Sequence, residues 1–150
     1  MHGLRSIILR LWHRLDRWHL TQALPSGAWG ERWAARYLRL HGCRILGQNV
    51  RPCRHGELDL IAKQGKLFLF VEVKTRKDES HGRPMEAVNR QKRRLMRRCA
   101  NHWLNRRFLL NEQTLYRFDA VEVVGSPHQE LPEIRWIQGI DMSQTHAPEI

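Results

Sequence analysis

The sequence has few cysteines, no long apolar run and no internal repeat. Only three cysteines occur in 150 residues, and no two of them have the CxxC spacing. An odd number without metal-ligand spacing argues against a disulfide framework and against a zinc site, and is typical of reduced thiols in a cytoplasmic protein. The length, without a repeat or a low-complexity tract, predicts one compact domain with short extensions.

Acidic residues are scarce relative to basic ones. The chain has 26 Lys and Arg against 15 Asp and Glu, which gives a formal net charge of +11. Such an excess favours a polyanionic partner, and we expect nucleic acid, DNA more than RNA. An anionic membrane surface and a basic protein that is merely soluble are the alternatives.

The first 22 residues lack an uninterrupted apolar segment. Charged and polar side chains break every apolar run, so the segment cannot span a bilayer. Its apolar residues still fall at helical spacing beside a basic face, which predicts an amphipathic extension at residues 1–22. Three alternatives remain: a helix packed on the domain or on a second subunit, a peripheral membrane helix, and a floppy extension. We favour the packed helix over membrane contact.

The rest of the chain predicts a domain at residues 23–140 and a disordered tail at 141–150. Ser26 and Pro84 are residue types typical of helix starts, and Gly42 is typical of a helix end. An α/β or α+β fold is predicted, in which helices flank a mixed sheet of about five strands. Helices are expected at residues 28–40, with Ser26 as the cap, and at 84–105, and strands at residues 43–50, 56–62, 67–75, 115–124 and 133–140.

Charged residues interrupt the apolar hairpin GELDLIAKQGKLFLFVEVKTR at residues 56–76. With a turn at residues 64–65, the predicted register places Asp59 opposite Phe70. Because side chains alternate along a strand, one face of the hairpin collects four charged residues, near the end away from the turn. They are Glu57, Asp59, Glu72 and Lys74.

Neighbouring carboxylates need a counter-charge. Two of them about 6 Å apart repel by roughly 3 kcal/mol at an effective dielectric constant near 20. Lys74 and Arg76 could supply the charge as an ordinary ion-paired rim. Mg²⁺ would supply it better, since it prefers a few carboxylate oxygens and keeps several waters. A cation there would lower the pKa of a bound water, while a nearby lysine stabilises charge on a phosphate.

An Asp on one strand and Glu-x-Lys on the next resemble the PD-(D/E)xK nuclease core. The stretches GAWGERWAARYL, QNVR, GELDLIA, FVEVKTR and RFDAVEVV resemble, in order and spacing, the YraN-like family of small bacterial proteins. That family is similar to archaeal Holliday-junction resolvases, so a restriction-endonuclease-like core is implied. The resemblance covers most of residues 27–140. Leu58 stands where the superfamily has a variable proline.

The resemblance implies a metal-dependent endonuclease that hydrolyses phosphodiester bonds in DNA, with branched or single-stranded DNA as candidate substrates. Asp59 and Glu72 would hold Mg²⁺, or Mn²⁺ in its place, and Lys74 would be the catalytic lysine. Glu31 would complete the site from the first helix. Three roles stay open for Glu57: an extra metal ligand, a residue that orients a ligand, or a charge at the rim of the site. The alternative function is a nucleic-acid-binding module that keeps the nuclease fold without cutting.

Basic residues around the hairpin and on the second predicted helix are candidate phosphate contacts. Such contacts give affinity without sequence specificity, and the alternative is a solvated helix face. A homodimer is also considered, since a junction resolvase cuts two symmetric strands. The candidates are Arg51, Arg54 and Arg76 beside the hairpin, and Lys92, Arg93 and Arg97 on the helix.

Several remaining residues are interpreted structurally. Asp119 is predicted to pair with Arg117 or another group at the core edge rather than to act in catalysis. His55 is expected to be a polar loop residue. Four tryptophans in predicted elements are expected in the core or at its rim: Trp29, Trp33, Trp103 and Trp136.

Overall fold

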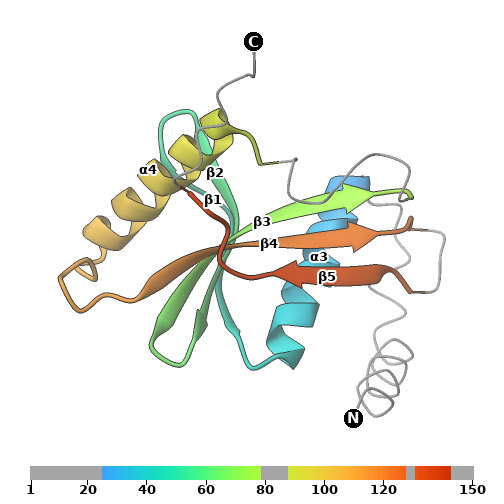
Figure 1. The fold of residues 1–150 in the computed structure, drawn as a ribbon, viewed down its shortest axis with the longest axis horizontal. Coiled ribbons are helices and arrows are strands. Elements are labelled where there is room, and N and C mark those ends of the chain that lie inside the picture. The colour runs from blue at the N-terminus through green and yellow to red at the C-terminus, as the bar shows by residue number, and fades with distance from the viewer. Residues whose placement is uncertain (1–24, 79–87, 128–130, 143–150) are drawn as a thin grey trace.

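The computed structural model describes residues 25–78, 88–127 and 131–142. The predicted extension at residues 1–22, the helix start at Pro84 and most of the predicted tail lie outside these ranges. The described part confirms an α+β fold with a mixed five-stranded sheet (Figure 1). Its elements are α3 (Ser26–Leu40), β1 (Arg44–Cys53), β2 (Gly56–Gln64), β3 (Leu67–Arg76), α4 (Arg90–Arg106), β4 (Tyr116–Val124) and β5 (Glu133–Ile137).

The strands follow one another across the sheet in the order β1-β2-β3-β4-β5. All neighbours are antiparallel except β3 and β4, which pair in parallel. Two parallel neighbours need a long crossover, and α4 lies in the connection between them. No helix in the described ranges is long and apolar enough to cross a membrane.

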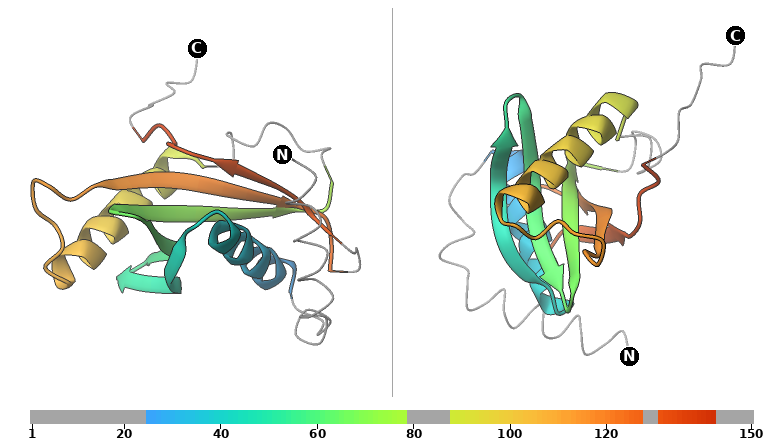
Figure 2. Two further views of the ribbon diagram at one scale, coloured as in Figure 1. Left: turned by 90° about the horizontal axis from the view of Figure 1, so that it is seen from below. Right: turned by 90° about the vertical axis from the view of Figure 1, so that its left-hand side faces the viewer.

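The two helices cover different parts of the sheet and form two cores. On β3 and β4, strand residues of alternating parity separate into one cluster with α4 and another with α3, as the two faces of a pleated sheet require, whereas Leu58 near the start of β2 joins the α4 cluster out of parity. The left view of Figure 2 shows α3 below β3 and β4, with α4 toward the other end of the strands. Three tryptophans are buried in these cores and the fourth packs against one, which confirms their structural role: Trp103 with α4, and Trp29, Trp33 and Trp136 with α3.

Both helix starts differ from the predicted ones. Ser26 is the first helical residue, with Pro25 in the capping position and no side-chain cap. The second helix begins at Arg90, later than Pro84, because the Asn89 side chain accepts a hydrogen bond from Lys92 N–H at 2.9 Å. The predicted end of the first helix is confirmed, since Gly42 follows it with a left-handed φ of 79°.

The hairpin register differs from the predicted one by two residues. Gln64 pairs with Leu67, so the turn is at residues 65–66 rather than 64–65. Gly65 has a φ of 58°, and two-residue hairpins favour glycine at the first turn position for this conformation. A shift of two keeps every side chain on its predicted face. In this register Asp59 is no longer opposite Phe70. It lies one residue beyond the last pair, Leu60 with Val71, near Glu72.

Candidate active site

Asp59 lies where the ladder between β2 and β3 stops. The last pair is Leu60 with Val71, and Val73 N–H donates to Asp59 Oδ2 at 2.8 Å instead of to a backbone carbonyl. The Asp59 carboxylate therefore accepts the hydrogen bond of a backbone N–H that lies beyond the last strand pair. This bond fixes Asp59 beside the strand that carries Glu72.

Glu72 is a buried carboxylate with two lysine partners. Its side chain is 3% exposed, and its oxygens lie 2.9 Å from Lys74 Nζ and 2.8 Å from Lys92 Nζ. Lys74 comes from the same strand, whereas Lys92 reaches it from the first turn of α4. An isolated buried charge is costly, and the two ammonium groups offset the cost of burying this carboxylate.

The structure gives Lys92 a place that differs from the surface phosphate contact expected of it. Its ammonium is part of the acidic site. The apolar stripe of α4 held a signal for this position, because residue 92 lies four residues after Val88 and three before Leu95 and so faces the sheet. Because Lys92 lies within a run of basic residues, the sequence pattern had indicated a position on the exposed basic face.

The electrostatics of the site favour a cation. Burial, and then the like charge of Glu72, raise the pKa of Asp59 to about 7, against the hydrogen bond from Val73 and the charge of Lys92. Burial acts to lower the pKa of Lys92, but its hydrogen bond to Glu72 and the nearby carboxylates outweigh this, so that pKa is raised. Burial and the charges of Glu72 and Glu31 thus outweigh the charge of Lys92 at Asp59, and a bound cation would offset them.

Glu31 approaches the acid pair from α3. Asn49 Nδ2 on β1 donates to Glu31 Oε2 at 2.8 Å, and the charge of Glu31 contributes to the raised pKa of Asp59. Asn49 has a left-handed φ of 49°, which Asn adopts more readily than most residues. No role was predicted for Asn49, because its partner is distant in sequence. The structure thus brings Glu31 toward the group it was expected to assist.

A glycine sets how closely α3 approaches the strand of Glu72 and Lys74. A Cβ added at Gly30 would lie 1.8 Å from Thr75 Oγ1. We expect Gly30→Ala to lower the free energy of unfolding by about 1–3 kcal/mol, because α3 must shift away together with Glu31. Gly27→Ala is the matched control in urea unfolding, since a Cβ there meets nothing within 4 Å. Equal stability of the two variants would contradict this packing.

Glu57 lies at the rim of the site. Arg51 Nε, on β1, donates to Glu57 Oε2 at 2.9 Å, and the two side chains are 76% and 33% exposed. The charge of Glu57 also contributes to the raised pKa of Lys92. The exposure and the arginine partner favour the rim-charge interpretation among the three left open by the sequence.

Arg76 is placed inside an ion-pair network rather than on an open surface. Its Nε lies 2.9 Å from Glu122 Oε1 on β4, and Arg135 of β5 lies 3.5 Å from the other oxygen. Glu122 is buried, and no pattern in the sequence had singled it out. These pairs connect three strands at the end of the sheet where β3 finishes.

Two of the predicted phosphate contacts on α4 bind the backbone of the protein. Arg93 Nε donates to Val88 O at 2.8 Å, and Arg97 donates to Met142 O at 2.7 Å. Arg54 is exposed in the β1–β2 turn, and its carbonyl accepts a hydrogen bond from Arg98 at 3.0 Å.

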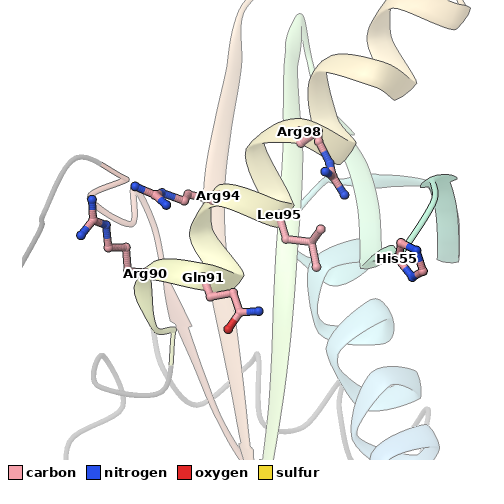
Figure 3. A pocket seen from close by; sticks show the side chains of 6 residues that line it. All are labelled: His55, Arg90, Gln91, Arg94, Leu95 and Arg98. Atoms are coloured by element: carbon pink, nitrogen blue, oxygen red, sulfur yellow. The ribbon is translucent and has the colours of Figure 1, made fainter.

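An open pocket of about 670 Å³ lies between α4 and the β1–β2 turn. Figure 3 shows Arg90 and Arg94 on one side, His55 on the other, and Leu95 between them. His55, expected only as a polar loop residue, is part of the lining. The full lining is His55, Arg90, Gln91, Arg94, Leu95 and Arg98.

Asp119 has the structural role predicted for it. It is fully buried, and Arg117 donates to its two oxygens at 2.7 and 2.9 Å. Trp136 Nε1 and Gly139 N–H donate to the same carboxylate at 2.9 Å each. Four donors satisfy its acceptor sites, and they attach β5 and the segment after it to β4.

The acid pair fits a cation that takes few protein ligands. Within the described ranges, no group of three or more His, Cys, Asp and Glu side chains is placed to hold a metal ion. Mg²⁺ commonly uses only one or two carboxylates, with waters and substrate phosphates completing its shell. Asp59 and Glu72 could provide these, and the raised pKa of Asp59 marks a position where added positive charge is favourable.

Comparison with known proteins relates the chain to a family without an assigned activity. The model of "Uncharacterised protein family UPF0102" matches residues 30–123, a range that contains the acid pair and both lysines. The chain is 44% identical over 98 residues to a UPF0102 protein of Alkaliphilus metalliredigens, which covers 65% of this chain and 83% of that protein. Identity is 48% over 101 residues to one of Nocardia farcinica, covering 67% and 77%. It is 35% over 126 residues to one of Clostridium acetobutylicum, covering 84% and 95%.

Proposed function

Because the chain belongs to the uncharacterised protein family UPF0102, the YraN-like family, we propose its activity from its own site: a metal-dependent endonuclease that hydrolyses phosphodiester bonds in DNA. The observation that carries the proposal is the acid pair with its lysines. A partly buried Asp59 with a raised pKa lies beside a buried Glu72 that two ammonium groups hold in place. Phosphoryl chemistry has a use for each part of this arrangement.

Each residue of the site has a role in the proposed reaction. Asp59 and Glu72 would hold Mg²⁺ or Mn²⁺, which when bound supplies a water of lowered pKa and screens the phosphate from the carboxylates. Lys74 places its ammonium next to these carboxylates, where it stabilises negative charge that develops on a phosphate oxygen. Lys92 orients Glu72 by contacting the carboxylate oxygen that Lys74 does not contact. Glu31, held by Asn49, adds a carboxylate that can accept a hydrogen bond from water.

Cleavage of a substrate panel tests the proposal. We expect the purified protein to nick at least one of single-stranded, flapped and junction DNA when Mg²⁺ or Mn²⁺ is present, and EDTA to stop it. Asp59→Asn and Glu72→Gln should remove this activity, because each takes away a carboxylate that holds the cation. Glu112→Gln, an exposed loop acid, makes the same change of charge and should cut like the wild type. Nicking that persists in both acid variants would assign the activity to a contaminant.

One observation favours a second candidate, a nucleic-acid-binding module without cleavage. Both oxygens of Glu72 already contact ammonium groups, so the site is partly neutralised without a divalent ion. This candidate predicts salt-sensitive DNA binding that is indifferent to divalent metal and survives both acid variants. The cleavage panel separates the two candidates, because only the first predicts nicking.

A further inference from the structure

Helix α4 presents one side chain to the acid pair and a separate stripe of arginines to solvent. Lys92 reaches Glu72, whereas Arg90, Arg94 and Arg98 line the pocket beside the β1–β2 turn (Figure 3). We propose that this pocket binds backbone phosphates of a polynucleotide next to the acid pair. The inference rests on the proposed function for its choice of ligand, but not on cleavage. Arg94 and Arg98 belong to the basic run of the second predicted helix, and Arg90 extends this run to the helix start.

The charges of the arginine stripe, Arg90, Arg94 and Arg98, repel one another when no ligand is bound. The three arginines follow one another at intervals of four residues, so their charges lie on one helix face and repel. Arg90 is also the first residue of α4, where the helix dipole disfavours a cation and favours an anion. Among the residues that the structure describes, none of the three has an acidic partner. A ligand that carries several negative charges would offset this repulsion.

The pocket is shaped before any ligand binds. Arg98 is held by its hydrogen bond to Arg54 O, which fixes one guanidinium at the wall. The close approach of α4 to β2 depends on Gly56, because a Cβ there would lie 2.2 Å from Cys99 Sγ. Arginine forks match phosphate oxygens in geometry, and a guanidinium whose position is already fixed loses less entropy on binding.

The position of the pocket suits a strand whose cut phosphate lies at the acid pair. Gln91 and His55 line the pocket, while the neighbouring Lys92 and Glu57 belong to the acidic site and its rim. With a rise of about 1.5 Å per residue, Arg94 and Arg98 lie roughly 3 and 9 Å beyond Lys92 along the helix axis. One DNA strand advances about 3.4 Å per nucleotide, so the bound phosphates would be about one to three nucleotides from the cut.

Binding measured in EDTA tests the pocket independently of cleavage. Fluorescence anisotropy of a labelled DNA 20-mer would compare the wild type with Arg90→Gln/Arg94→Gln over a salt series. Each phosphate contact contributes a slope of about 0.9 in log affinity against log salt, or about eightfold between 1 M and 0.1 M salt. The double variant should therefore bind about 60-fold more weakly at about 0.1 M salt, with a slope lower by about two.

The control makes the same charge change elsewhere. Arg39 and Arg44 are exposed at the end of α3 away from Glu31, and Arg39→Gln/Arg44→Gln should change affinity by less than threefold or so. Equal losses in the two double variants would overturn the proposal, because net charge alone would explain binding. So would a pocket variant that loses binding to vesicles of anionic lipid while keeping its affinity for DNA.

Stability distinguishes a binding role from a structural one. Because the stripe repels itself, Arg90→Gln/Arg94→Gln should melt at the same temperature as the wild type or higher. A lower melting temperature would assign the arginines to the fold and overturn the proposal. The proposed endonuclease activity is judged separately: DNA binding through the pocket with no nicking in Mg²⁺ would support this inference and sink the proposed function.

Discussion

Asp59→Asn is expected to stabilise the metal-free protein at pH 8 by about 3 kcal/mol. The pKa of Asp59 is raised from 3.8 to about 7, so its ionised form costs roughly 4 kcal/mol relative to the unfolded chain. Asparagine removes this cost and can still accept the hydrogen bond from Val73, although a neutral acceptor loses about 1 kcal/mol. A residue that supports function would thus weaken the fold.

The pH dependence has a defined sign and window. Between pH 3.8 and about 7 the folded chain keeps a proton on Asp59 that the unfolded chain has released. Raising the pH through this window therefore lowers the free energy of unfolding. From pH 5 to pH 8 the wild type should lose about 3 kcal/mol relative to Asp59→Asn, so the two are nearly equal at pH 5. Urea unfolding at the two pH values, in EDTA, measures the difference.

The matched control for this prediction is Glu112→Gln, which removes an exposed carboxylate and should leave stability unchanged at both pH values. A variant Asp59→Asn that is no more stable than the wild type at pH 8 would show that the carboxylate is not under electrostatic strain. The excess of negative charge at the site would then lack its main support.

Glu72→Gln should have the opposite effect and destabilise the protein by about 3 kcal/mol at pH 8. The buried carboxylate is the shared partner of Lys74 and Lys92, and its loss leaves two ammonium groups facing a neutral amide. Removing one partner of a buried pair typically costs about 3–5 kcal/mol, and the 36% and 27% exposure of the two lysine side chains places this site at the lower end. Urea unfolding in EDTA again provides the measurement.

The double variant sharpens the second prediction. Because Glu72 contributes to the raised pKa of Asp59, Asp59→Asn should stabilise the Glu72→Gln protein less than it stabilises the wild type. Residues in one charge network commonly couple in this way, by about 0.5–3 kcal/mol. If the changes in the free energy of unfolding of the two single variants add up to that of the double variant, the two carboxylates do not share their counter-charges.

The sequence predicted correctly which side chains lie on the same face of the hairpin, but it did not predict the strand register that positions them. The alternation along the two strands placed Asp59, Glu72 and Lys74 on one face, and the structure agrees because that face depends only on parity. The register depends on which residues make the turn, and KQGK allows two answers. A left-handed Gly65 suits either turn, and the pairing of Gln64 with Leu67 in the structure decides between them.

The basic residues were the least predictable part of the site. A run such as Lys92 to Arg98 shows how much charge a helix carries, but the packing of α4 decides which positions face the sheet. Lys92 contacts Glu72, three arginines donate to backbone carbonyls, and one of these three, Arg98, also lines the pocket. Asn49 and Glu122 were missed because their partners come from elements distant in sequence.

The parallel pairing of β3 with β4 has a consequence for how the protein folds. The hairpin of β2 and β3 joins residues close in sequence, so it can form early, whereas the crossover that delivers α4 requires the closure of a long loop. Until that closure, Asp59 and Glu72 lack the ammonium of Lys92. We therefore expect the docking of α4 to complete the charge balance of a hairpin that forms before it.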